Sequence, residues 1–206
     1  MITLALDTST SRGSVAVLED GVLLFGEDFT ADRSHSSHLF SSLERASFVV
    51  PGYDQVVIGL GPGSYSGVRI AISAAIGIEF ALRTPLIGIP SPAAMETDSM
   101  HYQTLGDARR GTFYYAQFSE GISLEGPLLL TADALREKLA LHPSLPIFTS
   151  DSLPDFPEAK RAYPSAAKLA RLAEQGIGIH STGDLEPIYL RDPHITLPKN
   201  RSGIAV

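Results

Sequence analysis

The sequence contains no cysteine, which excludes disulfide bonds and metal sites built from thiolates. A leader-like start is also lacking, because Met1–Leu4 enter a strand-like alternation with no basic segment and no apolar core before it. The longest apolar stretch, Val68–Leu82, is interrupted by Arg69 and Glu79 and indicates a buried helix rather than a membrane span. We therefore expect a cytoplasmic protein with no membrane segment.

Positive charge is scarce as well. The chain has 16 Lys and Arg against 23 Asp and Glu, a net charge of −7 at pH 7. We expect no attraction of a polyanion over the whole surface, so another protein would supply most phosphate contacts to any RNA. Hydrophobic residues at 44% and charged residues at 19% indicate a folded chain, and 206 residues suffice for one large domain or two small ones.

The first half has clear periodic patterns. Alternating apolar residues predict three strands, the second and third joined by a tight turn at Asp20-Gly21. Helical spacing then alternates with short apolar runs. The predicted elements are strands at Ile2–Leu6, Ser14–Leu18 and Val22–Phe25, a helix at Ser37–Ser47, a strand at Gln55–Leu60, a helix at Val68–Leu82 and a strand at Pro85–Ile89. This order predicts a mixed sheet flanked by helices.

The second half has weaker signals of a related kind, which indicate a smaller lobe. The predicted elements are strands at Thr112–Phe118, Leu145–Thr149 and Ile188–Leu190, helices at Thr131–Leu141 and Ser165–Gln175, the latter ending at Gly176, and a frayed tail at Pro198–Val206. The segment Ser91–His101 is the best lobe boundary, so we expect two domains, residues 1–98 and 99–206.

The loop Gly61–Gly67 has three glycines and a proline between a predicted strand and a predicted helix. Such a loop can bring backbone amides to an anion at a helix N-terminus. It lacks the lysine of a Walker A loop, and its glycine spacing misses the dinucleotide fingerprint by one residue. Its spacing alone favours a tight turn with close packing.

Three other polar clusters leave alternatives open. The loop Asp7–Arg12 could cradle a phosphate or hydrogen-bond to itself, and the turn Asp107–Gly111 could grip an anion or form a local ion pair. His35 and His38 share one helix face but have no third ligand nearby, which favours a solvated helix start over a metal site.

Five segments together resemble the TsaB (YeaZ) family: Leu4–Thr10, Gly61–Arg69, Pro85–Ile89, Asp107–Gly111 and Leu185–Arg191. The resemblance covers nearly the whole chain. It implies an α/β protein with the actin-like ATPase (ASKHA) fold, in two lobes that each hold a mixed sheet flanked by helices, the second lobe reduced. It also implies a part in making threonylcarbamoyladenosine beside the anticodon of tRNA.

The resemblance implies a non-catalytic subunit. Where the catalytic paralogue TsaD has two metal-binding histidines, this chain has Ser91 and Met95, neither of them a ligand suited to that metal. Where TsaD has an Asp-Glu pair, the chain has Ser11-Arg12, and no counterpart of its Thr-Asp-Asn segment is found. The resemblance therefore implies that this chain retains the fold of the family and lacks the catalytic metal site.

The implied partners are a TsaD-type transferase as a heterodimer, a TsaE-type ATPase, a second copy when the chain is alone, and tRNA through the complex only. Small residues in Val68–Leu82 suit close helix packing, so this helix and Ser37–Ser47 are predicted to form the partner surface. The candidate contacts are Leu39, Phe40, Leu43, Ile72, Ala75, Ile76 and Glu79.

The chain needs no cofactor under this hypothesis, and ATP or ADP would be a ligand of the complex interface. The candidate phosphate contacts are Asp7, Thr8, Ser9, Ser11, Arg12, Gly61, Gly63 and Ser64. Two other classes remain as alternatives, an ATP-binding enzyme of the sugar or acetate kinase type and a metallopeptidase of the glycoprotease type. ATP turnover by the pure chain would favour the first, and bound metal with glycoprotein cleavage the second.

Overall fold

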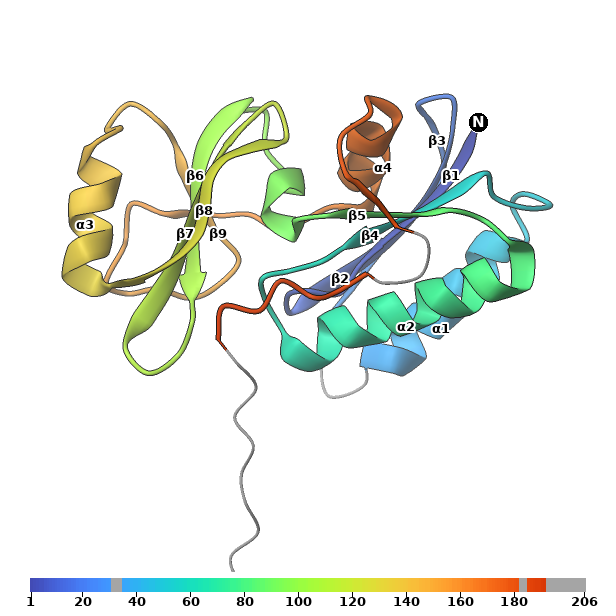
Figure 1. Ribbon diagram of the computed structural model, residues 1–206, viewed down its shortest axis with the longest axis horizontal. Helices are drawn as coiled ribbons and strands as arrows, with labels where there is room; N and C mark the ends of the chain where they lie inside the picture. Colours follow the sequence, from blue (N-terminus) through green and yellow to red (C-terminus); the bar gives the residue numbers. More distant parts are fainter. Residues whose placement is uncertain (31–34, 182–184, 192–206) are drawn as a thin grey trace, which may run out of the picture.

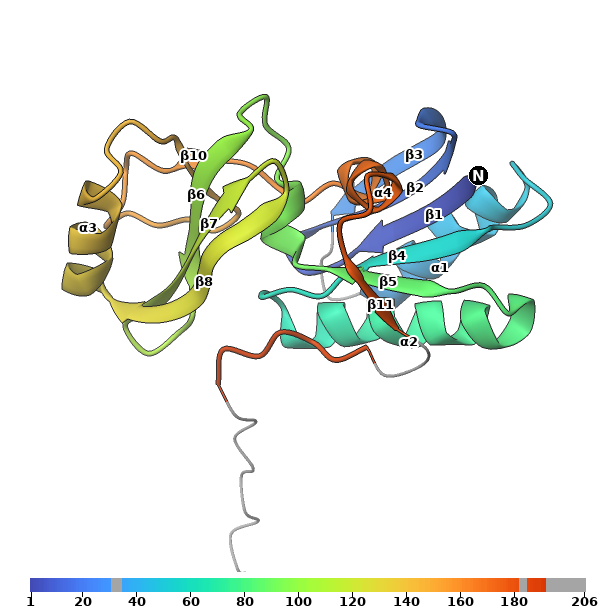
Figure 2. The same cartoon turned by 45° about the horizontal axis from the view of Figure 1, so that its top comes forward.

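The computed structural model describes residues 1–30, 35–181 and 185–191, which form two lobes side by side (Figures 1 and 2). Each lobe is built on its own mixed sheet. The expected α/β architecture with two lobes is confirmed.

The first sheet has the strand order β11-β5-β4-β1-β2-β3 among the described residues. β1, β4 and β5 are parallel, while β2 and β3 continue the sheet as an antiparallel meander. The strands are β1 (Ile2–Asp7), β2 (Arg12–Glu19), β3 (Val22–Thr30), β4 (Gln55–Gly59), β5 (Leu86–Ile89) and β11 (Ile179–Ser181). The Asp20-Gly21 turn between β2 and β3 has both residues at positive φ, as the sequence predicts.

Helices cover both faces of this sheet. α1 (His35–Ser47) and α2 (Tyr65–Leu82) lie together on one face, and α4 (Ala166–Glu174) lies on the other (Figure 1). The strand residues alternate between the two: Leu4 and Leu6 pack with the α1–α2 side, and Ala5 with the α4 side. This is the period-2 division that a strand buried on both faces produces.

The second sheet has the order β10-β9-β6-β7-β8. Its strands are β6 (His101–Asp107), β7 (Thr112–Ser119), β8 (Ile122–Thr131), β9 (Ile147–Thr149) and β10 (Lys160–Arg161). α3 (Ala132–Ala140) packs on one face, and its N-cap Thr131 accepts a hydrogen bond from Ala134 N at 3.4 Å.

The two lobes meet through one hydrophobic cluster that contains residues of both sheets. Ala5 and Leu18 of the first lobe belong to it, as do Tyr102 and Phe118 of the second. The short 3-10 helix η1 (Ser91–Ala94) leads from the first lobe to the second, and after β10 the chain returns, so that α4 and β11 pack with the first sheet. The predicted domain boundary near residue 98 stays a prediction. Residues 166–174 and 179–181, which that boundary assigns to the second domain, lie with the first lobe's sheet.

Of two sequence expectations for the C-terminal part of the chain, one is wrong and the other falls on residues that the structure does not describe. The strand expected at Ile188–Leu190 is wrong: Ile188 N donates to Leu60 O at 2.8 Å, but this single bond makes no ladder, and Pro187 beside it has no N–H to donate. The tail Pro198–Val206 lies outside the described residues.

α2 is long and apolar enough to cross a membrane by length and composition, but its inner face, from Val68 to Ala75, belongs to the first lobe's core.

Candidate functional site

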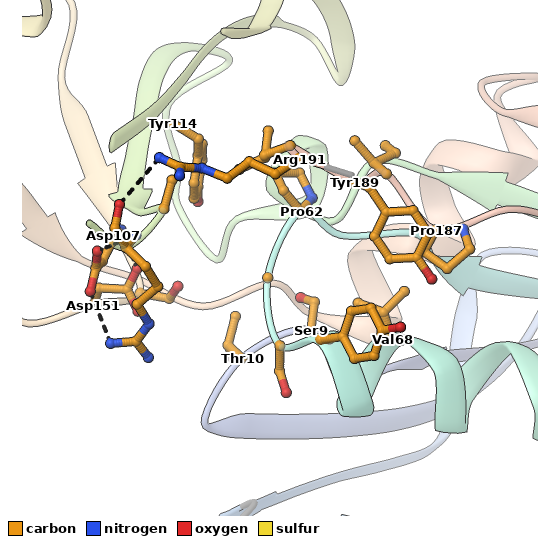
Figure 3. Close-up of a pocket in the computed structure, with 18 of the residues that line it drawn as sticks. Ser9, Thr10, Pro62, Val68, Asp107, Tyr114, Asp151, Pro187, Tyr189 and Arg191 are labelled. Carbon is orange, nitrogen blue, oxygen red and sulfur yellow. Dashed lines mark hydrogen bonds and ion pairs between the residues drawn. The ribbon is translucent and has the colours of Figure 1, made fainter. Parts of the chain in front are cut away.

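A cleft of about 660 Å³ opens between the lobes (Figure 3). Its first wall comes from the loops after β1 and β4 together with the start of α2, and its second wall from the β6–β7 turn and the end of β9. The segment 187–191 runs along it. The lining residues are Ser9, Thr10, Ser11, Pro62, Gly63, Ser64, Tyr65, Val68, Asp107, Ala108, Arg109, Tyr114, Ser150, Asp151, Pro187, Ile188, Tyr189, Leu190 and Arg191.

The glycine loop packs backbone to backbone against the loop after β1. A Cβ on Gly63 would lie 2.0 Å from Ser9 O, and a Cβ on Gly67 would lie 1.9 Å from Thr8 O. Ser64 N donates to the same Ser9 carbonyl at 2.6 Å, and Thr8 Oγ1 donates to Gly67 O at 2.7 Å. Close packing of the two loops therefore requires glycine at both positions. The spacing of the glycines alone favours the same interpretation.

Asp7 is fully buried and does not line the cleft. Its Oδ1 accepts from Ser9 N at 2.8 Å and from Ser9 Oγ at 2.7 Å, while Oδ2 has no hydrogen-bond partner among the described residues. Burial raises the pKa of the Asp7 carboxyl, and the nearby hydroxyls of Ser91 and Ser9 only partly oppose this. A Cβ on Gly59 would lie 1.8 Å from Oδ2, so the chain also packs tightly behind it.

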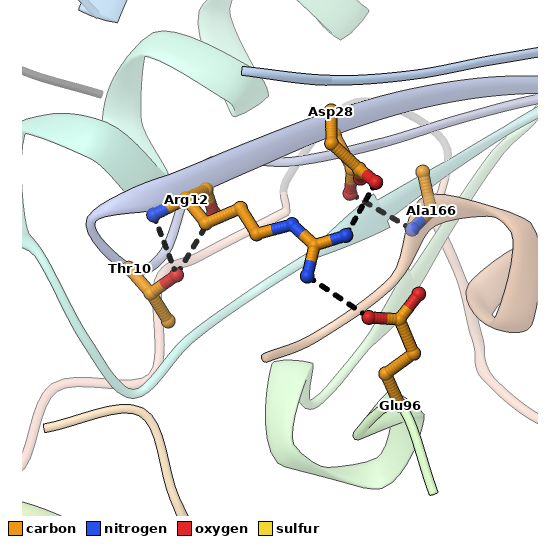
Figure 4. A network of polar contacts seen from close by, with 6 residues as sticks. Thr10, Arg12, Asp28, Glu96 and Ala166 are labelled. Atoms are coloured by element: carbon orange, nitrogen blue, oxygen red, sulfur yellow. Dashed lines mark hydrogen bonds and ion pairs between the residues drawn. The ribbon is translucent and has the colours of Figure 1, made fainter. Parts of the chain in front are cut away.

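Arg12 is held by two carboxylates outside the cleft (Figure 4). Its guanidinium pairs with Asp28 on β3 and, at 3.0 Å, with Glu96 after η1, and it lies 5.6 Å from the ring centre of Tyr163. Asp28 is the leading cause that raises the pKa of Arg12. The side chain fastens the first lobe to the connecting segment, and its charge is already paired.

The structure brings half of the predicted phosphate contacts into the cleft. Ser9, Ser11, Gly63 and Ser64 line it; the other four, Asp7, Thr8, Arg12 and Gly61, do not. Ser64 caps α2 by accepting from Gly67 N at 3.2 Å. The hydroxyl groups of Ser9 and Ser64 are therefore bonded within the loops of the first wall.

The second wall contains residues that sequence reasoning did not connect with the first. Asp151 Oδ2 accepts from Asp107 N at 2.8 Å, and Asp107 pairs with Arg109 at 3.0 Å, the local ion pair considered for this turn (Figure 3). Arg109 and Arg110 both adopt left-handed backbone conformations, at φ 66° and 56°. Burial is the main cause that raises the pKa of Tyr114 beside them, with the charge of Asp151 adding to it. No sequence signal joined Asp151 to this turn, because the two lie 44 positions apart in the chain.

Ser91 and Met95, where the resemblance implies metal ligands in the catalytic paralogue, have structural contacts in this chain. Ser91 is buried, and its Oγ accepts from Gly61 N at 3.0 Å, which ties η1 to the glycine loop. Met95 is buried in the cluster that the lobes share. Within residues 1–30, 35–181 and 185–191, no three His, Cys, Asp or Glu side chains form a metal-binding group. His38 stacks on Phe29 at 6.0 Å between ring centres.

The predicted partner contacts separate into two sets. Leu39, Ile72 and Ala75 are buried in the first lobe's core, and Leu43 packs partly against it, so these side chains serve the fold of the single chain. Phe40, Ile76 and Glu79 are accessible on the outside of α1 and α2.

The outer sides of the two helices carry further large apolar residues. Phe80 is 89% exposed, Phe40 is 55% exposed and Ile76 is 38% exposed. Other exposed apolar residues on or just after these helices are Phe48, Val49 and Leu82. We call Phe40, Ile76 and Phe80 the outer stripe.

Comparison with known proteins assigns the chain to a family. The family model for TsaD, tRNA N6-adenosine threonylcarbamoyltransferase, matches residues 30–139, just over half of the chain. An uncharacterized Mycobacterium tuberculosis protein is 31% identical over 141 residues, which cover 63% of this chain and 64% of the relative. The Bacillus subtilis tRNA threonylcarbamoyladenosine biosynthesis protein TsaB is 27% identical over 132 residues, covering 59% and 58%.

A solved structure agrees over most of the chain. A Pseudomonas aeruginosa protein, described as similar to peptidase YEAZ, superimposes with a TM-score of 0.74 at 26% identity and covers 92% of this chain and 99% of its own. The chain spans less than two thirds of the length of the curated relatives in these sequence matches. From the family model, these relatives and this common fold, the chain belongs to the TsaB (YeaZ) family, within the wider family that the TsaD model describes.

Proposed function

We propose that the chain is a non-catalytic subunit of the cytoplasmic complex that makes threonylcarbamoyladenosine in tRNA. In this complex it pairs with a TsaD-type transferase, which modifies the adenosine beside the anticodon. The observation that carries the proposal is the outer stripe, because three large apolar side chains face solvent on the two helices that cover one face of the sheet. A helix pair from a partner would bury them in an intersubunit bundle.

The cleft supports the non-catalytic part of the proposal. Asp7, the candidate acid of the first lobe, is buried, bonded to Ser9 and absent from the cleft lining. The positions where the transferase binds metal hold Ser91 and Met95, and both have structural contacts in this chain. Arg12 is occupied by two carboxylates.

The remaining partners follow from the same proposal. A TsaE-type ATPase joins the pair, tRNA is contacted through the complex, and the chain alone forms a homodimer through the outer stripe. The chain itself requires no cofactor, and ATP or ADP binds at the interface of the complex. A net charge of −7 supports contact with tRNA through other subunits.

The alternatives are an ATP-binding enzyme of the kinase type and a metallopeptidase. The cleft between the lobes is the feature that a kinase would use, and Ser9, Ser11, Gly63 and Ser64 lie in it. ATP hydrolysis or phosphoryl transfer by the pure chain would favour that class. Stoichiometric bound metal with cleavage of a glycoprotein would favour the other.

The experiment is size-exclusion chromatography with light scattering on the chain alone and mixed with its transferase. We expect a heterodimer for the wild type and loss of that heterodimer for Ile76→Glu, because a carboxylate would be desolvated in the bundle. Ile76 is accessible in the single chain, so this variant stays folded. Ala75→Glu is unsuitable, because Ala75 is fully buried and the variant would unfold the lobe itself.

A matched control is Leu124→Glu on β8, which introduces the same charge at a residue 60% exposed on the other lobe. This variant should bind the transferase like the wild type. Pairing that survives Ile76→Glu, or that is lost equally with Leu124→Glu, would reject the outer stripe as the partner surface.

A further inference from the structure

The segment Leu185–Arg191 runs from the first lobe toward the second, along the side of the molecule away from α4 (Figure 1). It begins on the first lobe: Leu185 is buried in that lobe's core, and a Cβ on Gly88 would lie 2.9 Å from its side chain. Three residues later, Ile188 N donates to Leu60 O at 2.8 Å, at the end of β4. This half of the segment is fixed by packing and by a backbone hydrogen bond.

The next contact ties the segment to the start of α2. Arg69 Nε donates to the Tyr189 hydroxyl at 2.7 Å. The Arg69 guanidinium carbon lies 3.9 Å from the ring centre of Tyr65 and 5.5 Å from that of Tyr189, and the two rings are 5.6 Å apart. Stacking and hydrogen bonding together hold Tyr189 against the first lobe.

Two residues on, the segment reaches the second lobe. Arg191 Nη2 donates to Thr112 Oγ1 at 2.6 Å and lies 3.4 Å from Arg109 O (Figure 3). Thr112 Oγ1 itself donates to Arg109 O at 2.9 Å. The guanidinium therefore binds the framework of the β6–β7 turn, a contact between residues 79 positions apart in the chain.

These contacts lie across the cleft from the joint between the lobes. That joint is the hydrophobic cluster in which Ala5 and Leu18 meet Tyr102 and Phe118, whereas residues 187–191 line the cleft. Two bodies joined on one side can open about that joint unless a second attachment spans the gap. We propose that Leu185–Arg191 is a strap that fixes the opening of the cleft, with Tyr189 as its first-lobe anchor and Arg191 as its second-lobe anchor.

The strap can be tested without the transferase, because the inference does not depend on the proposed partner. The labelled chain is diluted with unlabelled chain, so that the distance within one copy is measured even if the chain alone forms a homodimer. The chain has no cysteine, so spin labels can be attached at Glu19→Cys on β2 and Glu137→Cys on α3, both exposed and outside the strap's contacts. The distance between them is measured by pulsed electron resonance in the labelled chain and in the same chain with Tyr189→Ala and Arg191→Ala. The control is Arg171→Ala, an exposed arginine on α4.

We expect a longer mean distance and a broader distribution when both anchors are removed, and no change with Arg171→Ala. Hydrogen exchange supplies a second readout: the Thr112 amide, which donates to Arg109 O at 3.2 Å, should exchange roughly tenfold faster in Arg191→Ala. A distance distribution identical to that of the labelled wild type would overturn the proposal. Faster exchange at Thr112 with an unchanged distribution would also overturn it, because Arg191 would then stabilise only the turn.

Discussion

The two walls of the cleft are built in opposite ways. In the first wall, the hydroxyl groups of Ser9 and Ser64 bond to neighbouring loop atoms, and Gly63 allows the Ser9 carbonyl to approach closely. The second wall ends in a turn whose Arg109 side chain is 86% exposed and whose backbone is left-handed at two arginines. The Gly61–Gly67 loop thus packs closely against the loop after β1, as its spacing alone favours, whereas the second wall has an exposed charged side chain at Arg109.

The largest effect should come from the packed wall. In Gly63→Ala the new Cβ would meet the Ser9 carbonyl oxygen at 2.0 Å, so the two loops must separate and the Ser64–Ser9 hydrogen bond must break. We expect the free energy of unfolding to fall by about 3 kcal/mol, measured by urea denaturation.

The control for this change is Gly52→Ala, where a Cβ would meet nothing within 4 Å. Its effect should be neutral, or a gain of about 0.5 kcal/mol from the lower entropy of the unfolded chain. Equal effects of the two substitutions would show that the close approach of the loops is not what requires glycine.

A smaller effect should come from Asp7, the buried carboxyl that bonds to Ser9 of the same wall. Because burial raises the pKa of Asp7 in the folded chain, the unfolded chain ionises first, and ionisation favours unfolding. The stability that Asp7 contributes is therefore full below the ordinary carboxyl pKa and is lost as pH rises through the raised value. Asp7→Asn keeps an oxygen to accept from Ser9 and removes this loss, so the variant should gain on the wild type as pH rises.

Urea denaturation across a pH series checks this sign. The comparison variant is Asp133→Asn on α3, which makes the same substitution at a carboxylate whose side chain is 92% exposed. A gain for Asp7→Asn that is largest at low pH and vanishes at neutral pH would contradict the assignment of a raised pKa.

The smallest effect should come from the exposed wall. The backbone of Arg110 has φ 56°, its side chain has no hydrogen-bond or ion-pair partner among the described residues, and glycine adopts this conformation freely. Arg110→Gly should raise the free energy of unfolding by about 0.5 kcal/mol, since relief of about 1 kcal/mol is partly offset by greater freedom of the unfolded chain.

Arg110→Ala removes the same charge and keeps the left-handed strain, so it isolates the backbone contribution. Thermal unfolding of both variants gives the comparison. If the alanine variant gains as much stability as the glycine variant, charge rather than backbone conformation governs this turn.

Local periodicity predicted most helices and strands of the first lobe. It could not tell which side of a helix is buried against the sheet and which side is exposed. α2 has apolar residues on several sides, so spacing suggested Ala75 and Ile76 equally as partner contacts, and only the sheet behind α2 buries Ala75. β8 was missed because Gly126-Pro127 interrupts its pattern, and β6 because its sequence mixes polar and apolar residues on a strand that is almost wholly buried. Contacts such as Arg191 with Thr112 join distant segments and leave no local signal.

The most direct test of the central claim is tRNA modification reconstituted with this chain, its transferase, the ATPase and the threonylcarbamoyl donor, each omitted in turn. The account predicts no modification without the transferase, strong loss without this chain, and the same loss when Ile76→Glu replaces the wild type. Threonylcarbamoyl transfer by this chain in the absence of the transferase would contradict the account and make the interlobe cleft an active site.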